Sequence, residues 1–277
     1  MLEDKFADTG LGKPAEHVSR YTPSLLQPVL RTRLRAGLLP EGKDLPFEGA
    51  DLWTAWELSW LDRDGKPEVA VAQIRVPCQS RAVVESKSLK LYLGSFAQTP
   101  FASTYDVART LESDLSVTVG GQVVVDLLSL NQTVQAGVGV FPGESLDTLR
   151  IGDFVYMPDP GLLAVADENR IVSETLHTNL FRSLCPVTGQ PDIASVQVAY
   201  SGSLIDRESL LRYLVSYREY PGFHERCVEK IFLEIMERCA PRELSVHARY
   251  LRRGGIDINP FRSTDRGIPA HTRLARQ

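Results

Sequence analysis

A cysteine in the second half of the chain stands where catalytic nucleophiles are often found. Cys185 belongs to the segment SLCPVTGQPD, in which Pro186, Gly189 and Pro191 prevent a strand from continuing. A thiol at the junction of a rigid strand and a loop is well placed for nucleophilic catalysis. The alternative is a half-buried cysteine that acts as a small hydrophobic side chain, and the sequence leaves both interpretations open.

An aspartate follows this cysteine at a distance that a short loop can span. Asp192 lies seven residues after Cys185, so we expect the loop to fold its carboxyl group back near the thiol. A carboxyl group kept protonated in a dry pocket can donate a proton to a nitrogen atom that gains negative charge. The alternative is a turn aspartate that caps local backbone N–H groups.

A histidine and a glutamate open the last predicted helix. His224 and Glu225 follow Pro221-Gly222, and because position 228 is Val the pair is not part of an HExxH zinc motif. A glutamate that faces a pocket can bind two adjacent N–H donors of a guanine-like ring. The alternative is an acidic residue that only interacts favourably with the dipole at the start of its helix.

Two further segments carry cationic groups that suit a phosphate. The segment VESKSLKLY (84–92) changes from strand to helix and places Lys87 and Lys90 near the helix start, where free backbone N–H groups favour anions. The segment RRGG (252–255) lets guanidinium groups and backbone approach a phosphate together, although a solvated basic turn is the alternative. A third segment, GVGVFPG (137–143), looks like a dinucleotide-binding fingerprint, but it has proline in place of the third glycine and no following helix, so we expect no Rossmann site.

Composition limits the class of protein. The chain has 277 residues, 43% hydrophobic and 24% charged, which suits two modest domains or one large one. Its net charge of −4 argues against sequence-independent nucleic-acid binding. An acidic start without a signal-peptide core, and no run near the ~18 apolar residues of a membrane span, predict a cytosolic protein with no membrane partner. The scattered cysteines predict neither a disulfide framework nor a structural zinc site, with structural roles for Cys78, Cys227 and Cys239.

The elements that would carry these residues occur twice in the same order. Residues 1–50 read as an irregular arm around an apolar segment, 25–39. The first half then has strands at 51–61 and 68–76, a turn at 62–65, helices at 86–96 and 105–115, and a strand at 122–130. The second half has strands at 174–182 and 193–200, helices at 206–218 and 223–239, and a strand at 242–251. The order predicts an α+β fold of two antiparallel modules with paired helices on one sheet face, 51–160 and 161–277, divided within 158–167.

Taken together, these segments resemble the QueF family. Its members are NADPH-dependent nitrile reductases that convert 7-cyano-7-deazaguanine to 7-aminomethyl-7-deazaguanine on the route to queuosine in tRNA. The resemblance rests on ESKSLKLY at 85–92, on Cys185 with Asp192, on the His-Glu pair at 224–225, and on RRGGIDINP at 252–260. Residues 11–13 and 21–23 also look like the start of the family's long, two-module form, and the resemblance covers nearly the whole chain.

The resemblance implies a fold and a distribution of roles. It implies two tandem tunnelling-fold (T-fold) modules that assemble into a barrel, so a homodimer or another homo-oligomer is expected, with each pocket built between modules. It implies a small-molecule substrate, no metal and no direct nucleic-acid contact. For Lys90, the alternative of a solvated helix residue stays open. The site residues that it implies are Cys185 and Asp192 for catalysis, Val84, Glu85, Ser86, His224 and Glu225 for substrate binding, and Ser86, Lys87, Arg253 and Gly254 for NADPH binding.

The implied chemistry begins at the thiol of Cys185. Its thiolate adds to the nitrile carbon and gives a covalent thioimidate, Asp192 protonates the nitrogen, and two NADPH molecules bring the substrate to the amine. Two other classes stay open: a zinc-dependent T-fold hydrolase of a purine or pterin that uses Cys185 and His224, and a non-catalytic module that binds a purine or a partner protein. Each function predicts a different result. The nitrile reductase consumes two NADPH per amine, the hydrolase shows zinc-dependent turnover without NADPH, and the non-catalytic module binds without turnover.

Overall fold

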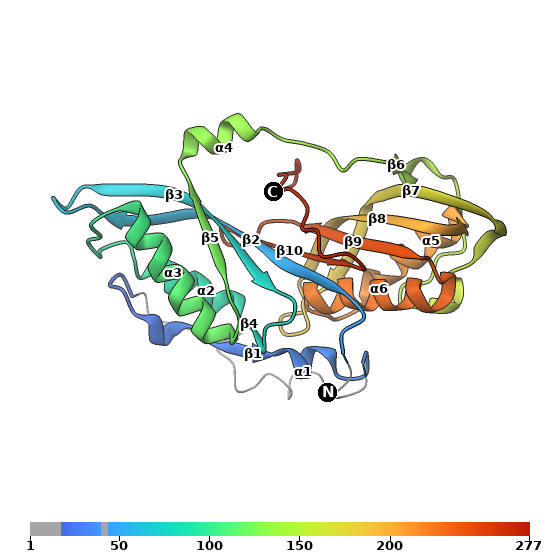
Figure 1. The fold of residues 1–277 in the computed structure, drawn as a ribbon, viewed down its shortest axis with the longest axis horizontal. Helices are drawn as coiled ribbons and strands as arrows, with labels where there is room; N and C mark the ends of the chain where they lie inside the picture. Colours follow the sequence, from blue (N-terminus) through green and yellow to red (C-terminus); the bar gives the residue numbers. More distant parts are fainter. Residues whose placement is uncertain (1–17, 40–43) are drawn as a thin grey trace. The chain divides into compact units, whose positions relative to one another are not determined.

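The computed structural model describes residues 18–39 and 44–277, which form two compact units (Figure 1). Unit 1 consists of the described residues within 1–36, 51–138 and 252–258, and unit 2 of those within 37–50, 139–251 and 259–277. Residues 11–13, which the sequence relates to the family's long form, lie outside the described residues. Each unit contains antiparallel strands and α-helices, so the predicted α+β class is confirmed.

Unit 1 has a β-hairpin, two main helices and a returning strand, in the predicted order. The three main strands follow the order β5-β3-β2. Two short strands, β1 and β4, form a separate antiparallel pair. Asp62 and Lys66 close the hairpin turn through a backbone hydrogen bond of 2.9 Å. The elements are β1 (Pro28–Leu30), α1 (Arg31–Arg35), β2 (Glu48–Leu61), β3 (Pro67–Pro77), β4 (Ala82–Val84), α2 (Ser86–Gly94), α3 (Thr104–Val119), β5 (Val124–Leu128) and α4 (Leu130–Ala136), with a 3₁₀ turn at Pro23–Leu25.

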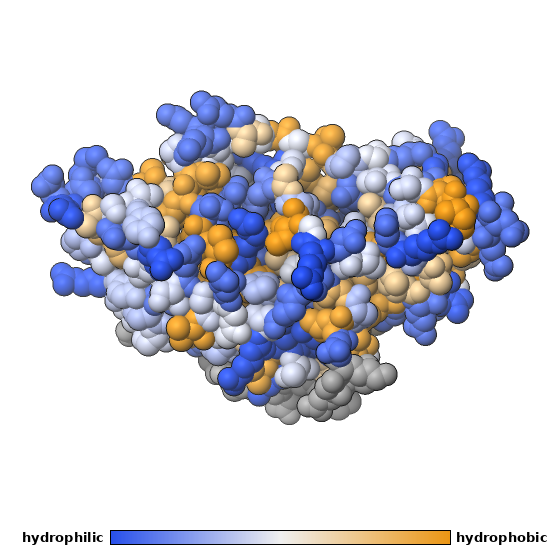
Figure 2. All heavy atoms as spheres, in the orientation of Figure 1, coloured by the Kyte–Doolittle hydropathy of each residue, from blue (hydrophilic) through white to orange (hydrophobic). Residues whose placement is uncertain are grey.

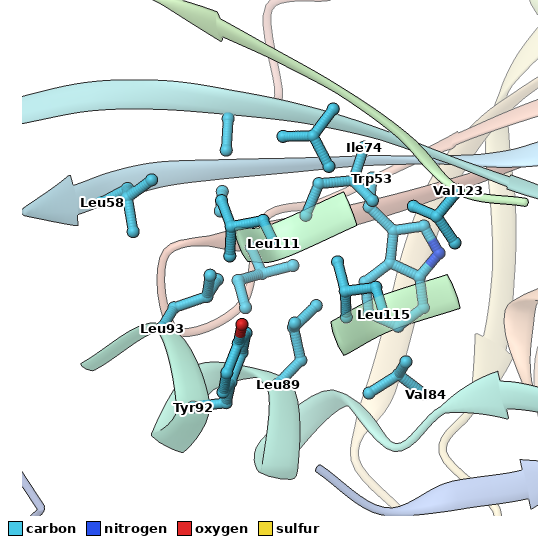
Figure 3. Packing of buried hydrophobic residues seen from close by; sticks show 14 of the residues in the cluster. Trp53, Leu58, Ile74, Val84, Leu89, Tyr92, Leu93, Leu111, Leu115 and Val123 are labelled. Atoms are coloured by element: carbon cyan, nitrogen blue, oxygen red, sulfur yellow. The ribbon is translucent and has the colours of Figure 1, made fainter. Parts of the chain in front are cut away.

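The core of unit 1 lies between these strands and the two helices. Figure 1 shows α2 and α3 along one face of β2, β3 and β5. Helix α3 places Val107, Leu111, Leu115 and Val119 on one stripe with four-residue spacing, and all are buried. They pack with Trp53 of β2 and with side chains of β3 and α2, which Figure 3 shows from close by. The site residues of α2 are therefore attached to a rigid layer.

Unit 2 repeats the hairpin, helix pair and strand with longer strands. Its strand order is β10-β9-β8-β7-β6, and α5 and α6 run along one face of the sheet (Figure 1). The inward side chains of β8 alternate along the strand, and Ala194, Val196, Val198 and Tyr200 are all buried. The elements are β6 (Glu144–Ser145), β7 (Val165–Leu184), β8 (Pro191–Ile205), α5 (Arg207–Val215), α6 (His224–Cys239), β9 (Glu243–Tyr250) and β10 (Ile256–Ser263), with 3₁₀ turns at Leu146–Thr148, Pro160–Leu162 and Ser216–Glu219.

The predicted elements exist, but several bounds differ for physical reasons. Helix α3 ends at Val119, four residues later than predicted, and Gly120, with a φ of 63°, forms its left-handed C-cap. Helix α4 was not predicted, although Ser129 and Gln132 form a capping box at its start. The first half of β7 is exposed and charged, so its hydropathy did not indicate a strand. Strand β10 was not predicted as a separate element, because it overlaps the RRGGIDINP motif at 252–260.

The compact units also interleave along the chain. The main change from unit 1 to unit 2 lies between Val138 and Gly139, because the segment after 138 contacts unit 2: β6 pairs with β7, and Gly139 N–H donates to Arg273 O at 2.8 Å. The arm also contains short regular elements rather than irregular chain alone. The ranges 51–160 and 161–277 stay a prediction for the modules.

Surface and helix composition agree with a globular protein. On the face shown in Figure 2, hydrophobic residues appear in separate patches among hydrophilic ones. Within 18–39 and 44–277, no helix combines the length and apolar character needed to cross a bilayer.

A buried ion pair ties α6 to β10 inside unit 2. Arg262 donates from Nε and Nη2 to one carboxylate oxygen of Glu229, at 3.1 and 2.8 Å. Its Nη1 donates to the carbonyl groups of Phe261 and Ala50, and its guanidinium lies 5.6 Å from the ring centre of Phe47. The two charged side chains are 0% and 2% exposed. Removal of one partner therefore leaves the other charge buried.

We predict that Glu229→Leu lowers the free energy of unfolding by about 3–5 kcal/mol, because the Arg262 guanidinium loses its carboxylate in a dry environment. Chemical denaturation measures the change. Glu237→Leu, an exposed position on the same helix, is the matched control and should change stability by less than about 0.5 kcal/mol. Equal stability losses for both variants would contradict the assigned role of the pair.

Candidate active site

The thiol of Cys185 lies at the tip of the β7–β8 hairpin. Cys185 is the first residue after β7, and its N–H donates to Gln190 O at 2.8 Å, while Gly189 N–H donates to Cys185 O at 3.0 Å. Gly189 has a φ of 65°, which favours glycine in this tight turn. The cysteine is partly exposed, unlike the other three free cysteines, which are buried. This thiol is therefore held in a closed loop and open to solvent.

Backbone hydrogen bonds join the end of β7 to the segment that leads into α6. Leu184 N–H donates to Tyr220 O at 2.9 Å, and Gly222 N–H donates to Leu184 O at 3.0 Å. A side chain at Gly222 would place its Cβ 2.7 Å from the Tyr220 ring and 3.2 Å from Cys227 Sγ. The close approach therefore requires glycine, and it places the start of α6 beside the residue that precedes Cys185.

Asp192 and His224 meet inside unit 2. Asp192 is the second residue of β8 and pairs with Ser183 of β7, so the alternative of a turn aspartate is wrong. Its Oδ2 lies 3.3 Å from Nε2 of His224, and the Asp192 side chain is 5% exposed. Because Ser183 lies two residues before Cys185, the register brings the carboxyl group to the same end of the hairpin as the thiol.

The start of α6 supplies a buried carboxylate. Glu225 is only 3% exposed although it lies in the first turn of the helix, so it is more than an exposed partner for the helix dipole. Cys227, two residues further along the helix, is fully buried, and burial raises the pKa of its thiol to about 12. Its thiol is thereby unsuited to act as a nucleophile, which agrees with the structural role predicted for it.

In unit 1, Glu85 caps the helix that follows it. Its carboxylate accepts hydrogen bonds from the N–H groups of Lys87 at 2.6 Å and Ser88 at 2.8 Å. The expectation of free backbone N–H groups at this helix start is therefore wrong for these two residues. Val84 ends β4 and is buried, and Glu85 N–H donates to Gln27 O at 2.8 Å. The substrate-binding roles of Val84, Glu85 and Ser86 stay predictions.

The second cationic segment forms a tight turn beside α2. Backbone hydrogen bonds in both directions between Arg253 and Ile256 close the turn, and Gly254 and Gly255 have φ values of 61° and 85°, which favour glycine at both positions. Gly255 O accepts from Trp56 N–H at 2.9 Å, which fixes the turn to β2. A Cβ at Gly254 would lie 2.9 Å from Lys90 Nζ. Lys90 thus reaches the turn.

The structure therefore brings the predicted cofactor segments together within unit 1. These segments form a set of groups that fits a phosphate-bearing ligand such as NADPH. The set consists of the helix start with Ser86 and Lys87, the Lys90 ammonium, and the Arg-Gly turn, which leaves room for close approach. Arg252 has a different contact, because its guanidinium lies over the Trp56 ring at 4.8 Å.

Sequence reasoning missed one neighbour of the site, Tyr250, and left the role of another, Lys90, open. Lys90 has the signal of lying one turn after Lys87, but only the fold shows that it meets Gly254. Tyr250 stacks on His224, and no local signal marks it, since a tyrosine at a strand end is common in cores. In the part of the chain that the structure describes, no three His, Cys, Asp or Glu side chains are grouped as metal ligands.

Comparison with known proteins identifies the family. Residues 17–127 match the family model described as "Nitrile reductase, 7-cyano-7-deazaguanine-reductase N-term", and residues 191–267 match the model described as "QueF-like protein". A solved structure, the archaeosine synthase QueF-Like in the apo form, matches at 20% identity over 36% of this chain and 96% of that chain. Its TM-score of 0.31 is too low for a comparison of folds.

Curated relatives match over almost the full length. A protein of Paraburkholderia phytofirmans is 50% identical over 268 residues, which cover 96% of this chain and 97% of that protein. One of Verminephrobacter eiseniae is 49% identical over 274 residues, with the same coverage of both chains. Both are named NADPH-dependent 7-cyano-7-deazaguanine reductase. The chain therefore belongs to the QueF family of nitrile reductases.

Proposed function

We propose that this protein reduces 7-cyano-7-deazaguanine to 7-aminomethyl-7-deazaguanine with two NADPH per nitrile, through a thioimidate on Cys185. The observation that carries the proposal is the cluster in unit 2: a partly exposed thiol, a buried aspartate in contact with a histidine, and a buried glutamate at the adjoining helix start. Names of the relatives support the substrate and the cofactor. The product is used in the biosynthesis of queuosine in tRNA.

Cys185 acts as the nucleophile. Its thiolate adds to the nitrile carbon, so a C–S bond forms, one carbon–nitrogen π bond breaks, and the nitrogen takes the electron pair. Asp192 supplies the proton that this nitrogen needs, because its carboxyl group lies in a dry site at the same end of the hairpin. The result is a thioimidate that is more readily reduced than the nitrile.

NADPH supplies the hydride for both reductions when it is bound. Ser86, Lys87, Arg253 and Gly254 would hold it, and Lys90 would add a second ammonium beside Gly254. After the first reduction, the C–S bond breaks, the thiolate of Cys185 is released and an imine stays bound. Exclusion of water at this stage prevents hydrolysis of the imine to an aldehyde.

Glu225 and His224 bind the deazaguanine ring. The buried carboxylate of Glu225 accepts from two adjacent N–H groups of the ring, a bidentate contact that selects a guanine-like edge. His224 shapes the pocket and contacts Asp192. Val84, Glu85 and Ser86 complete substrate binding. In this proposal the carboxylate of Glu85 binds the substrate while it also caps α2.

Two tandem T-fold modules, assembled as a homodimer or another homo-oligomer in the cytoplasm, are part of the same proposal. The repeated order of a hairpin, two helices and a strand supports the duplication. The helices of each unit cover one face of its sheet, which leaves the other face available for the inside of a barrel.

We expect Cys185→Ala to lower turnover by at least about 10³-fold, because the covalent step loses its nucleophile. NADPH consumption measured together with amine formation should give a ratio of two in the unchanged protein. Cys239→Ala, which removes a buried cysteine of the same unit, is the control and should retain turnover. Retained turnover in Cys185→Ala would overturn the mechanism, and zinc-dependent turnover without NADPH would favour a hydrolase.

Asp192→Asn should still form some thioimidate but should reduce it about 10²–10⁴-fold more slowly, because the nitrogen again gains negative charge when hydride adds to the carbon, and the amide cannot donate a proton to it as an acid does. Stopped-flow measurement of NADPH oxidation after adduct formation separates the two steps. The exposed variant Asp153→Asn is the control. A normal rate of reduction in Asp192→Asn would contradict the proposed role of Asp192 as the proton donor.

Glu225→Ala should weaken substrate binding by more than ~1.4 kcal/mol, about tenfold in Kd, because two ring N–H groups lose their acceptor. Calorimetry in the Cys185→Ala background measures noncovalent binding alone. Glu237→Ala, exposed on the same helix, serves for comparison. If both variants bind the nitrile equally, the placement of Glu225 on the ring is wrong.

A further inference from the structure

Tyr250 lies directly against His224. The phenol ring of Tyr250 and the imidazole of His224 are parallel to within 1°, with ring centres 3.6 Å apart. Tyr250 ends β9 and pairs with Ala194 of β8, two residues from Asp192. It is fully buried, so one face of the imidazole is covered by a ring that solvent does not reach.

Several contacts hold Tyr250 itself in place. Its N–H donates to Asn259 Oδ1 at 3.0 Å, and its carbonyl accepts from Gln277 Nε2 at 3.2 Å, while Gln277 also donates to Asn259 at 2.7 Å. On the side chain, Phe181 packs edge-on, with ring centres 6.2 Å apart at 90°. The ring is therefore a fixed surface whose position depends on the sheet and not on His224.

Two contacts together define the orientation of the imidazole. The stack on Tyr250 sets the plane of the ring, and the contact of Nε2 with Asp192 Oδ2 at 3.3 Å sets its direction within that plane. His224 is the first residue of α6, where its phenylalanine N-cap provides no side-chain hydrogen bond. Loss of the stack therefore removes one of these two constraints on the imidazole.

We propose that Tyr250 is a positioning residue of the active site, which holds the His224 imidazole in the plane that lets it contact Asp192 and the substrate. This inference rests on the proposed function, because the benefit of the orientation is the correct placement of the Asp192 proton and the nitrile. A catalytic group misplaced by about 1 Å can cost on the order of 10²-fold in rate. The required feature is the flat ring and not the hydroxyl group.

The surroundings of the hydroxyl support that distinction. It is buried beside the Cys227 thiol, and burial raises its pKa well above 10, so it stays protonated. Its polar neighbours are Ser183 and Cys227, and within 18–39 and 44–277 neither makes a hydrogen bond of ordinary geometry with it. Replacement by phenylalanine therefore keeps the stack and removes no hydrogen bond of that kind, whereas leucine removes the stack.

The test compares Tyr250→Phe and Tyr250→Leu with Phe232→Leu. Phe232 is an equally buried ring of α6 that packs on Phe47 rather than on His224, so its loss controls for the cavity alone. The first readout is the proton NMR spectrum of the substrate-free protein, with His224 signals assigned by their absence in His224→Gln. The second readout is kcat and KM for nitrile reduction by the folded variants.

We expect the stacked Tyr250 ring to shift the His224 ring protons upfield, and this shift to persist in Tyr250→Phe and Phe232→Leu but to disappear in Tyr250→Leu. In Tyr250→Leu, kcat should fall by about 10-fold to 100-fold with KM changed less than about threefold, while Tyr250→Phe stays within about threefold of the unchanged protein. Phe232→Leu should resemble Tyr250→Phe.

Two results for Tyr250→Leu would overturn the inference. The first is that the His224 ring-proton signals do not move, and the second is that their upfield shift disappears while kcat stays unchanged. An equal loss of kcat in Phe232→Leu would also overturn it, because packing alone would then account for the effect. The NMR comparison needs neither substrate nor turnover. An unchanged protein that fails to reduce the nitrile would contradict the proposed function, whereas the ring-proton shift would still decide whether the stack exists.

Discussion

The two backbone hydrogen bonds of Leu184 are the constraint on which the chemistry of unit 2 depends. They attach the end of β7 to residues 220–222, the segment that leads into α6. As a result, the Cys185 thiol on a hairpin and the His-Glu pair on a helix are held by backbone rather than by flexible side chains. Pairing of Ser183 with Asp192 adds the carboxyl group to the same end of the hairpin. A catalytic group on rigid elements keeps its geometry without further ordering.

Burial divides the cysteines and carboxylates of this region into different chemical types. Cys185 is partly exposed, whereas Cys227 is buried, and burial raises the pKa of its thiol to about 12. Glu225 and Asp192 are buried, and a charged group in a low-dielectric environment interacts more strongly with its partners than one in water. In unit 1, the cationic groups follow the opposite arrangement: Lys90 and Arg253 are exposed next to a glycine turn, where a phosphate can reach them. In the proposed reaction, the two units would thus supply different kinds of groups.

Much of this could be predicted from sequence, because the signals were local. The strand β8 and the helices α3 and α6 were predicted at about their observed places, and the change from strand to helix at Glu85 was correct to within a residue. Contacts between distant segments gave no such signal. The register that places Asp192 opposite Ser183, the reach of Lys90 to Gly254 and the stack of Tyr250 on His224 all depend on tertiary packing. The charged first half of β7 was missed because it is exposed, so its hydropathy resembles that of a loop.

The central claim is that the sulfur of Cys185 bonds to the carbon of a nitrile. Mass spectrometry of the protein incubated with 7-cyano-7-deazaguanine alone, without NADPH, tests it most directly. The account predicts an intact-mass increase equal to one substrate molecule per chain, located by peptide mapping on the peptide that contains Cys185 and reversed when NADPH is added. An unchanged mass, or an adduct located on another cysteine, would contradict the account.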